Sequence, residues 1–164
     1  MADVRSVNQM LADTFEPKRQ NRWYFQFEED VIPQFVAKTF SRPTFTQDSI
    51  VVDYINSKRY LAGKFEWGTM SMTLHDPIAP SSSQKVMEWA RLAHETISGR
   101  DGYAAFYKKD FSLKLMDPVG VVVEQWDMKG AYNTDADFGT LDYAAGDPVE
   151  ISLTIRPDEC ILRY

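Results

Sequence analysis

Residues 111–129, FSLKLMDPVGVVVEQWDMK, decide the fold class of this chain. In their first half, apolar residues at every second position alternate with a serine and a lysine, which is typical of an antiparallel strand with one face in the core. Residues 117–120, DPVG, predict a tight reversal, because proline fixes φ and glycine tolerates positive φ. The stretch therefore predicts a β-hairpin of two strands, 111–116 and 121–129.

The same alternation recurs in residues 23–27, 50–54, 69–74 and 149–156. The length of 164 residues suits one domain built around one core. We therefore expect a single domain over residues 1–164 that is mainly β, an antiparallel sandwich or small barrel. Residues 1–21 are polar and are expected to form an N-terminal arm.

One segment follows a helical period instead, with apolar residues spaced three and four apart. Ser81 and Gln84 form a capping-box pattern at its start, and Gly99 suits a left-handed C-cap. We expect a helix over about residues 82–98, packed on the sheets, and a second helix over residues 6–13. The apolar residues of the longer helix are Val86, Trp89, Ala90, Ala93 and Ile97.

Composition argues against several classes of function. The chain has 18 basic and 24 acidic residues and a net charge of −6, whereas a protein that grips DNA needs a basic face. The single cysteine, Cys160, excludes an internal disulfide and a thiolate zinc site, and we expect it to be a buried structural thiol. No apolar run has the length of a membrane helix and the N-terminal residues lack an apolar signal segment, so we expect neither membrane insertion nor secretion.

Patterns that carry catalysis or ligand binding are not visible in the sequence. His75-Asp76 follows a predicted strand and is expected to be structural, and His94 lies on the predicted helix. The two histidines lack the spacing of a metal site, and the acidic run 28–30 lacks the spaced oxygens of a calcium loop. No dinucleotide-binding, P-loop or nucleophile-elbow motif occurs. We therefore expect no catalytic residue, no metal and no cofactor, and a chain that is not an enzyme.

The order of several segments resembles the tail tube proteins of T-even-like contractile-tailed bacteriophages. The resemblance rests on the order and spacing of all of them, from about residue 25 onward. The segments are INSKRYLAGKF at 55–65, a strand followed by HD at 75–76, a helix with VMEW at 86–89, YKK at 107–109, MKGAYNT at 128–134 and an alternating strand from 149. The chain departs from the family in the EW pair of the helix and in AYNT, where the family has a DW-type pair and an LWPT-like run.

The resemblance implies a structural protein of the virion, located in the tail tube and made in the cytoplasm of the host bacterium. Such proteins form hexameric rings that stack helically into the inner tube of a contractile tail, and they share their fold with type VI secretion tube proteins. The implied partners are other copies of the chain, the tail sheath protein, the baseplate hub that initiates the tube, the tail terminator, and the tape measure protein and genomic DNA in the lumen. A net negative charge agrees with such a conduit, because acidic walls repel phosphates.

Three groups of contact residues are expected on this basis. The segment 42–64, with a turn at 56–59, is expected to reach the neighbouring ring through charges of both signs. The polar face of the hairpin 111–129 is expected to line the channel, and exposed charges of the helix are expected to meet the sheath through weak polar contacts. The stacking candidates are Asp48, Asp53, Lys58 and Arg59, the lumen candidates are Lys114 and Glu124, and the sheath-facing candidates are Glu88 and Glu95.

Two alternatives stay open at this point. The chain could form the tube of a bacterial contractile injection or type VI-like system, whose lumen carries protein. It could also be a carbohydrate-binding β-sandwich, because aromatic residues make up 13% of the chain and exposed rings stack on sugars. The aromatic candidates for that role are Trp23, Tyr24, Tyr54 and Tyr60, for which packing in the core or in a subunit interface is the competing interpretation.

Overall fold

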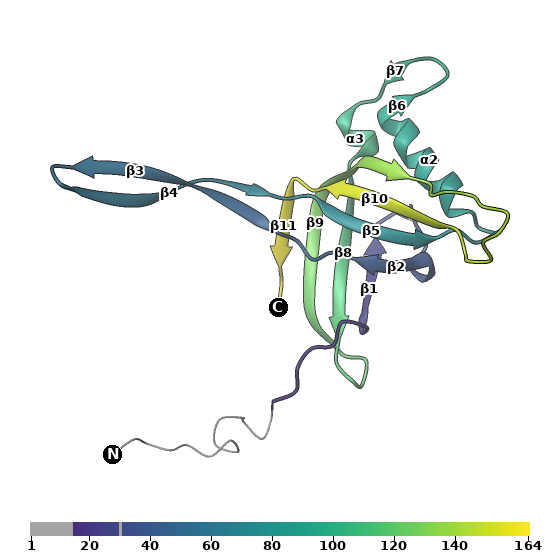
Figure 1. Ribbon diagram of the computed structural model, residues 1–164, viewed down its shortest axis with the longest axis horizontal. Helices are drawn as coiled ribbons and strands as arrows, with labels where there is room; N and C mark the ends of the chain where they lie inside the picture. Colours follow the sequence, from purple (N-terminus) through teal and green to yellow (C-terminus); the bar gives the residue numbers. More distant parts are fainter. Residues whose placement is uncertain (1–14, 30) are drawn as a thin grey trace.

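The computed structural model describes residues 15–29 and 31–164 of the chain (Figure 1). The helix predicted over residues 6–13 therefore lies outside the described residues. The helical elements are η1 (Gln34–Val36), α2 (Ser82–Ala93) and α3 (Ala104–Tyr107). The strands are β1 (Trp23–Phe27), β2 (Ala37–Phe40), β3 (Phe45–Tyr54), β4 (Ser57–Trp67), β5 (Met70–His75), β6 (His94–Glu95), β7 (Arg100–Asp101), β8 (Lys109–Met116), β9 (Val122–Asp137), β10 (Glu150–Arg156) and β11 (Glu159–Leu162).

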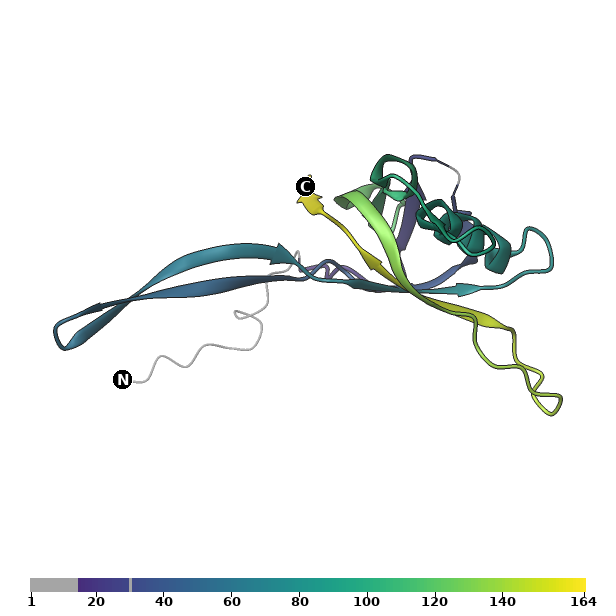
Figure 2. The ribbon, with the colours of Figure 1, turned by 90° about the horizontal axis from the view of Figure 1, so that it is seen from above.

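The main sheet is antiparallel and follows the order β1-β8-β9-β10-β5-β2, with β11 also paired to β9. The long strand β9 joins its two halves, because residues 122–131 pair with β8 and residues 132–137 pair with β10. Near the end of the first stretch Gly130 has a φ of 61°, and a side chain at this position would collide with Asp158. The strand curves there, so that the two halves of the sheet form two layers around one core (Figure 2).

The core lies between these layers and is closed by α2. Phe25 and Phe111 enter it from β1 and β8, while Met72 and Leu153 enter it from β5 and β10. Trp89 of α2 is buried against the same cluster. The alternating positions of β1, β5, β8 and β10 therefore build the core.

The hairpin predicted from residues 111–129 is confirmed as β8 and β9. The carboxylate of Asp117 accepts hydrogen bonds from the backbone N–H groups of Val119 and Val121 at 2.9 and 2.8 Å, and Gly120 has a φ of 91°. The strands predicted at 23–27, 69–74 and 149–156 are likewise confirmed as β1, β5 and β10. β9 continues to Asp137, well past the predicted end of the hairpin.

The predicted helix starts where expected but ends earlier. Ser81 is the N-cap, and its side chain accepts a hydrogen bond from the backbone N–H of Gln84 at 3.4 Å. At the other end, the N–H of Gly102 donates to the carbonyl oxygen of Ala93 at 2.9 Å. In a longer α-helix that carbonyl would bond the N–H of residue 97. The returning chain therefore takes the place of the next helical turn.

Residues beyond Ala93 form a small hairpin, β6 and β7, instead of helix. Gly99, expected as a helix C-cap, has a φ of 67° and makes the turn of this hairpin. Ile97, expected in the buried face, is 89% exposed. The prediction of a helix to residue 98 was wrong because the local spacing of apolar residues does not indicate that the chain reverses shortly after Ala93.

The adjacent pair His75-Asp76 serves the helix start, as expected for a structural pair. The carboxylate of Asp76 accepts hydrogen bonds from the backbone N–H groups of Ser82 and Ser83 at 2.8 and 3.2 Å and from the Ser81 hydroxyl at 3.3 Å. Burial alone would raise the pKa of Asp76, but the hydrogen bonds from Ser83, Ser82 and Ser81 outweigh it and lower the pKa. The charged form of Asp76 therefore stabilises α2.

Replacing Asp76 with alanine should lower the free energy of unfolding by about 1–2 kcal/mol, because the first turn of α2 loses its acceptors. Since the pKa is lower in the folded than in the unfolded chain, this stabilisation should be present above about pH 4 and lost as the pH falls through the folded pKa. Urea titrations of wild type and Asp76→Ala at pH 7 and pH 3 measure both effects. An Asp101→Ala control, at an exposed site, should change little; a pH-independent difference would contradict the assignment.

Candidate assembly surfaces

The hairpin of β3 and β4 projects from the body as a long arm (Figure 1). Sequence alternation predicted that residues 50–54 bury one face in the core, and this prediction is wrong, since every residue of β3 is exposed. A surface with so many apolar side chains marks an interaction site. The large exposed apolar residues of the arm are Phe45, Ile50, Val51, Val52, Tyr54, Ile55, Tyr60, Leu61 and Phe65.

Both faces of the arm are apolar along its middle. Ile50 lies opposite Leu61, and Val51 lies opposite Tyr60. Neighbouring residues of a strand point to opposite faces, so these two pairs occupy opposite sides of the ribbon. Burying both apolar faces of the arm requires contacts on both sides of the ribbon, which one small ligand would not supply.

The base of the arm is fixed to the body by an ion pair and by packed aromatic rings. Glu66 forms an ion pair with Arg156 of β10. Phe45, Phe65 and Trp67 pack ring against ring, with centroids 4.8 to 5.9 Å apart, and Trp67 meets Trp126 of β9 at 6.4 Å. These contacts set the direction in which the arm leaves the body.

The four stacking candidates all lie on the arm and all are exposed. Asp53 and Lys58 face each other across the strands, with the carboxylate and the ammonium 3.7 Å apart. The turn predicted at 56–59 is wrong, since Tyr54 pairs with Ser57 and Ile55 and Asn56 alone make the turn. Asp53, Lys58 and Arg59 therefore lie near the tip, beside apolar residues that were expected in a core, and Asp48 lies nearer the base of the arm.

The two lumen candidates lie on opposite faces of the hairpin β8–β9. Lys114 pairs with Gln125 on the polar outer face. Glu124 pairs with Leu115 on the core face and is only 4% exposed. Since directly paired residues share a face, the two side chains do not line one surface, and the placement of Glu124 on an open polar face is corrected. Lys114 stays a prediction.

Glu124 instead joins two segments that are distant in sequence. It forms ion pairs with Lys18 of the N-terminal segment and with Arg42 at the root of the arm, and its carboxylate accepts the indole N–H of Trp126 at 2.7 Å. Burial alone would raise the pKa of Glu124, but the hydrogen bonds from Lys18 and Trp126 and the charges of Arg42 and Lys18 lower it. The sequence signal is weak, because the apolar run 121–123 hides the alternation around Glu124.

Replacing Glu124 with alanine should lower the free energy of unfolding by about 1–3 kcal/mol, since the indole N–H of Trp126 loses its buried acceptor. Lys18 and Arg42 are about half exposed and can hydrate, so they add little to the loss. Trypsin should also cleave after Lys18 faster in this variant. Chemical denaturation and timed proteolysis check the two effects, with the exposed Glu88→Ala as the control. Equal cleavage rates would contradict the role of Glu124 in holding the N-terminal segment.

The sheath-facing candidates lie on different elements, since Glu88 is on α2 and Glu95 is on β6. Glu88 is exposed and lies 4.0 Å from the Lys85 ammonium. The expected polar character of this side is only partly met, because large apolar side chains are exposed nearby. They are Leu92, Ile97, Tyr103 and Phe106.

The remaining candidates have structural roles within the described residues. Burial raises the pKa of the Cys160 thiol to about 11, which suits an unreactive core residue. Glu28 and Glu29 of the acidic run form ion pairs with Lys129 and Lys109. Among the described residues no cluster of three metal-ligating side chains occurs. None of the helices in the described part of the chain is long and apolar enough to span a membrane.

The four aromatic candidates for sugar stacking do not form one platform. Trp23 lies against Phe40 of β2, with centroids 6.3 Å apart, and Tyr24 lies under the Lys114 ammonium at 5.5 Å. Tyr54 and Tyr60 are on the arm, on opposite faces. The geometry therefore gives the carbohydrate-binding alternative no support.

No protein-family model and no curated protein matches the sequence. Solved structures match over nearly the full length. A chain in the cryo-EM structure of the anti-feeding prophage cap, a tube-terminating cap, has a TM-score of 0.76 and 14% identity over 97% of this chain and 99% of that one. A chain in the extended sheath–tube complex of the extracellular contractile injection system PVC has a TM-score of 0.72 and 15% identity over 98% and 99%.

A more distant likeness extends to Hcp1 from Flavobacterium johnsoniae, with a TM-score of 0.54 and 12% identity over 87% of this chain and 94% of that one. Identities at this level show a shared fold. The predicted fold class, mainly β with antiparallel sheets and the architecture of tube and Hcp-like proteins, is therefore confirmed.

Proposed function

We propose that this chain is a structural subunit of the inner tube of a contractile machine and assembles into stacked hexameric rings. The observation that carries the proposal is the arm, whose two apolar faces lie outside the body and need partners. The fold supports it, because the chains it resembles occur in a tube-terminating cap and a sheath–tube complex.

Ring closure and stacking would cover surfaces that are exposed in the monomer, namely the edges of the main sheet and the arm. β1 and β2 end the main sheet, and exposed sheet edges are a liability that lateral pairing of subunits removes. The arm, with Asp53, Lys58 and Arg59 near its tip and Asp48 closer to its base, is the element proposed to reach the next ring. Charges of both signs beside apolar residues give such a contact both affinity and register.

For the finer function, the tail tube of a contractile bacteriophage remains our first proposal, with DNA as the cargo and with sheath, baseplate hub, terminator and tape measure as partners. The net charge of −6 favours a lumen through which DNA slides. The tube of a bacterial injection system with protein cargo is the second candidate, favoured by the likeness to a chain of the PVC sheath–tube complex.

Negative-stain microscopy of the purified chain tests the general proposal. Rings or tubes of uniform width are expected, with six-fold symmetry in class averages of end views. A monodisperse monomer at all concentrations and salt conditions would overturn it. Short DNA fragments and folded small proteins, offered during assembly, then separate the two cargo proposals by which of them is retained after nuclease or protease treatment.

Reversing the charges of Glu88 and Glu95 to lysine should leave free tubes intact but impair sheath loading, because both carboxylates lie on the proposed outer side. Purified sheath protein co-assembled with wild-type and doubly substituted tubes measures this by sedimentation. The free tubes of the variant serve as the control for folding. Unchanged sheath loading would contradict the placement of this surface.

A further inference from the structure

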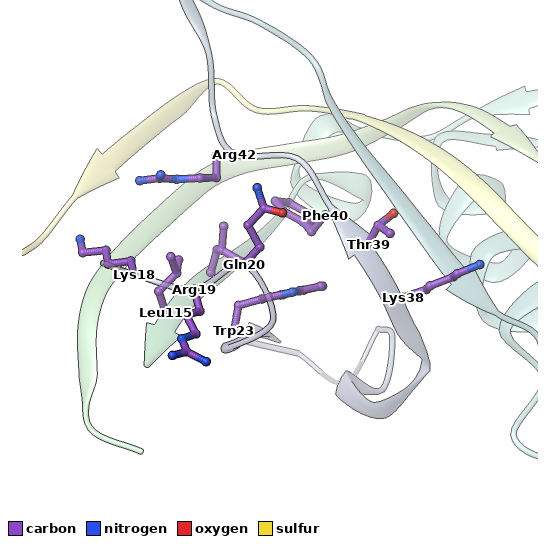
Figure 3. A pocket seen from close by; sticks show the side chains of 10 residues that line it. Lys18, Arg19, Gln20, Trp23, Lys38, Thr39, Phe40, Arg42 and Leu115 are labelled. Atoms are coloured by element: carbon purple, nitrogen blue, oxygen red, sulfur yellow. The ribbon is translucent and has the colours of Figure 1, made fainter. Parts of the chain in front are cut away.

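A pocket with an apolar floor and a cationic rim lies between the N-terminal segment and β2 (Figure 3). It has a volume of about 470 Å³. Trp23 and Phe40 line it together with Leu113 and Leu115 of β8. Four cationic side chains surround this floor, and they are Lys18, Arg19, Lys38 and Arg42.

The rim keeps a positive balance after its ion pairs are counted. Lys18 and Arg42 share the single carboxylate of Glu124, and Lys38 pairs with Glu150. The cations of these pairs are about half exposed, so they are open to a further acidic partner. The chemistry of the pocket therefore suits an aromatic or aliphatic side chain flanked by carboxylates.

One exposed segment of this same chain has that chemistry. The loop 138–149 between β9 and β10 contains two acidic residues, Asp142 and Asp147, and no lysine or arginine. It projects from the body (Figure 2). Tyr143 at its tip is 112% exposed and Leu141 is 85% exposed, and Asp142 lies between them.

The loop tip is held in shape by its own hydrogen bonds. The carboxylate of Asp142 accepts the N–H of Ala144 at 2.9 Å, and the N–H of Ala145 donates to the carbonyl oxygen of Asp142 at 3.2 Å. At the stem, the N–H of Gly139 donates to the carboxylate of Asp137 at 2.9 Å. A preformed tip loses little conformational freedom on docking.

We propose that the loop 138–149 of one copy of the chain docks in the pocket of a second copy, with Tyr143 on the apolar floor and Asp142 and Asp147 toward the cationic rim. The tip points away from its own body, so the contact is between copies (Figure 2). Because loop and pocket are different surfaces, the contact is head-to-tail, which generates closed rings or open helices. This inference rests on the proposed self-assembly and names a lateral contact distinct from the arm.

Cross-linking between two single substitutions tests the contact. Tyr143→Cys and Gln20→Cys, the latter in the lining of the pocket, are purified separately with tags of different mass, mixed under assembly conditions and oxidised. Cys160 is buried and stays in place as an unreactive thiol. We expect a disulfide-linked dimer that carries both tags, at about tenfold the yield obtained when Val119→Cys, at a comparably exposed turn residue, replaces Tyr143→Cys.

The possible outcomes separate this contact from the general function. Rings or tubes without a cross-link above the Val119→Cys level would overturn the loop contact and leave the tube proposal standing. Absence of both assemblies and cross-link would overturn both. A stronger link from Tyr54→Cys would make the arm tip the occupant and overturn the loop contact. In a second measurement, Tyr143→Ser should raise the concentration for half-maximal assembly about tenfold, whereas Ile97→Ser should not change it.

Discussion

A chain whose arm is shortened should still fold and form single rings but fail to form long tubes. The design removes residues 51–60 and joins Ile50 to Leu61 through Asn-Gly, because these two residues lie directly opposite each other and Asn-Gly suits a two-residue hairpin turn. The aromatic cluster and the Glu66–Arg156 ion pair at the base of the arm stay untouched. Each large apolar side chain that is fully buried between rings should contribute about 1.5–3 kcal/mol to the binding free energy of the inter-ring contact. The deletion removes these contributions.

Microscopy and sedimentation velocity measure the result, and circular dichroism with thermal melting verifies the fold. A second variant keeps the length of the arm and replaces the facing pair Val51 and Tyr60 with serine, which should raise the concentration needed for tube growth at least about tenfold. Val119→Ser is the matched control, at an exposed apolar residue away from the arm. Tubes of normal length from the shortened chain would show that stacking uses another surface.

The sequence predicts the core strands well because burial of one face requires apolar residues at every second position, which is a local pattern. The hairpin 111–129 carries both the alternation and the turn residues, but they do not reveal the register shift between Leu115 and Met116 that places Glu124 opposite Leu115. For the arm, the same alternation does not predict burial in the core. Residues 50–54 alternate as a core strand does, yet every one of them is exposed in this structure. Alternation does not indicate whether the same chain or, as proposed above, another subunit covers the apolar face.

Contacts between distant segments produce no local sequence pattern. Glu124 takes its cations from Lys18 and Arg42, more than eighty residues away, and its role depends on a register set by the whole hairpin. The end of α2 depends on the return of Gly102 to Ala93. In both places the local pattern favours another interpretation, an open lumen residue and a longer helix, whereas tertiary hydrogen bonds determine the structure.

Trp89 holds α2 to the sheet, and its replacement by alanine should give the largest loss of subunit stability. The side chain is 2% exposed, packs edge-on against Phe27 at 5.6 Å and donates its indole N–H to the carbonyl oxygen of Tyr107 at 2.7 Å. Truncation removes these contacts and leaves a cavity, so the free energy of unfolding should fall by about 3–5 kcal/mol. A typical domain has about 5–15 kcal/mol in total, so few such subunits would be available for assembly.

The measurement belongs in the arm-shortened background and at a concentration below that of ring formation, so that association does not add to the apparent stability of the subunit. Urea titrations there compare Trp89→Ala with Trp89→Phe, which keeps most of the apolar volume but lacks the indole donor, and with the exposed neighbour Glu88→Ala. The expected order of destabilisation is alanine, then phenylalanine, then a change at Glu88 within about 0.5 kcal/mol of zero. The phenylalanine variant separates packing from the bond to Tyr107, which ties α3 to α2. A loss below about 1 kcal/mol for Trp89→Ala would mean that α2 is held by the Asp76 cap and Val86 instead, and that the helix is an accessory of the sheet.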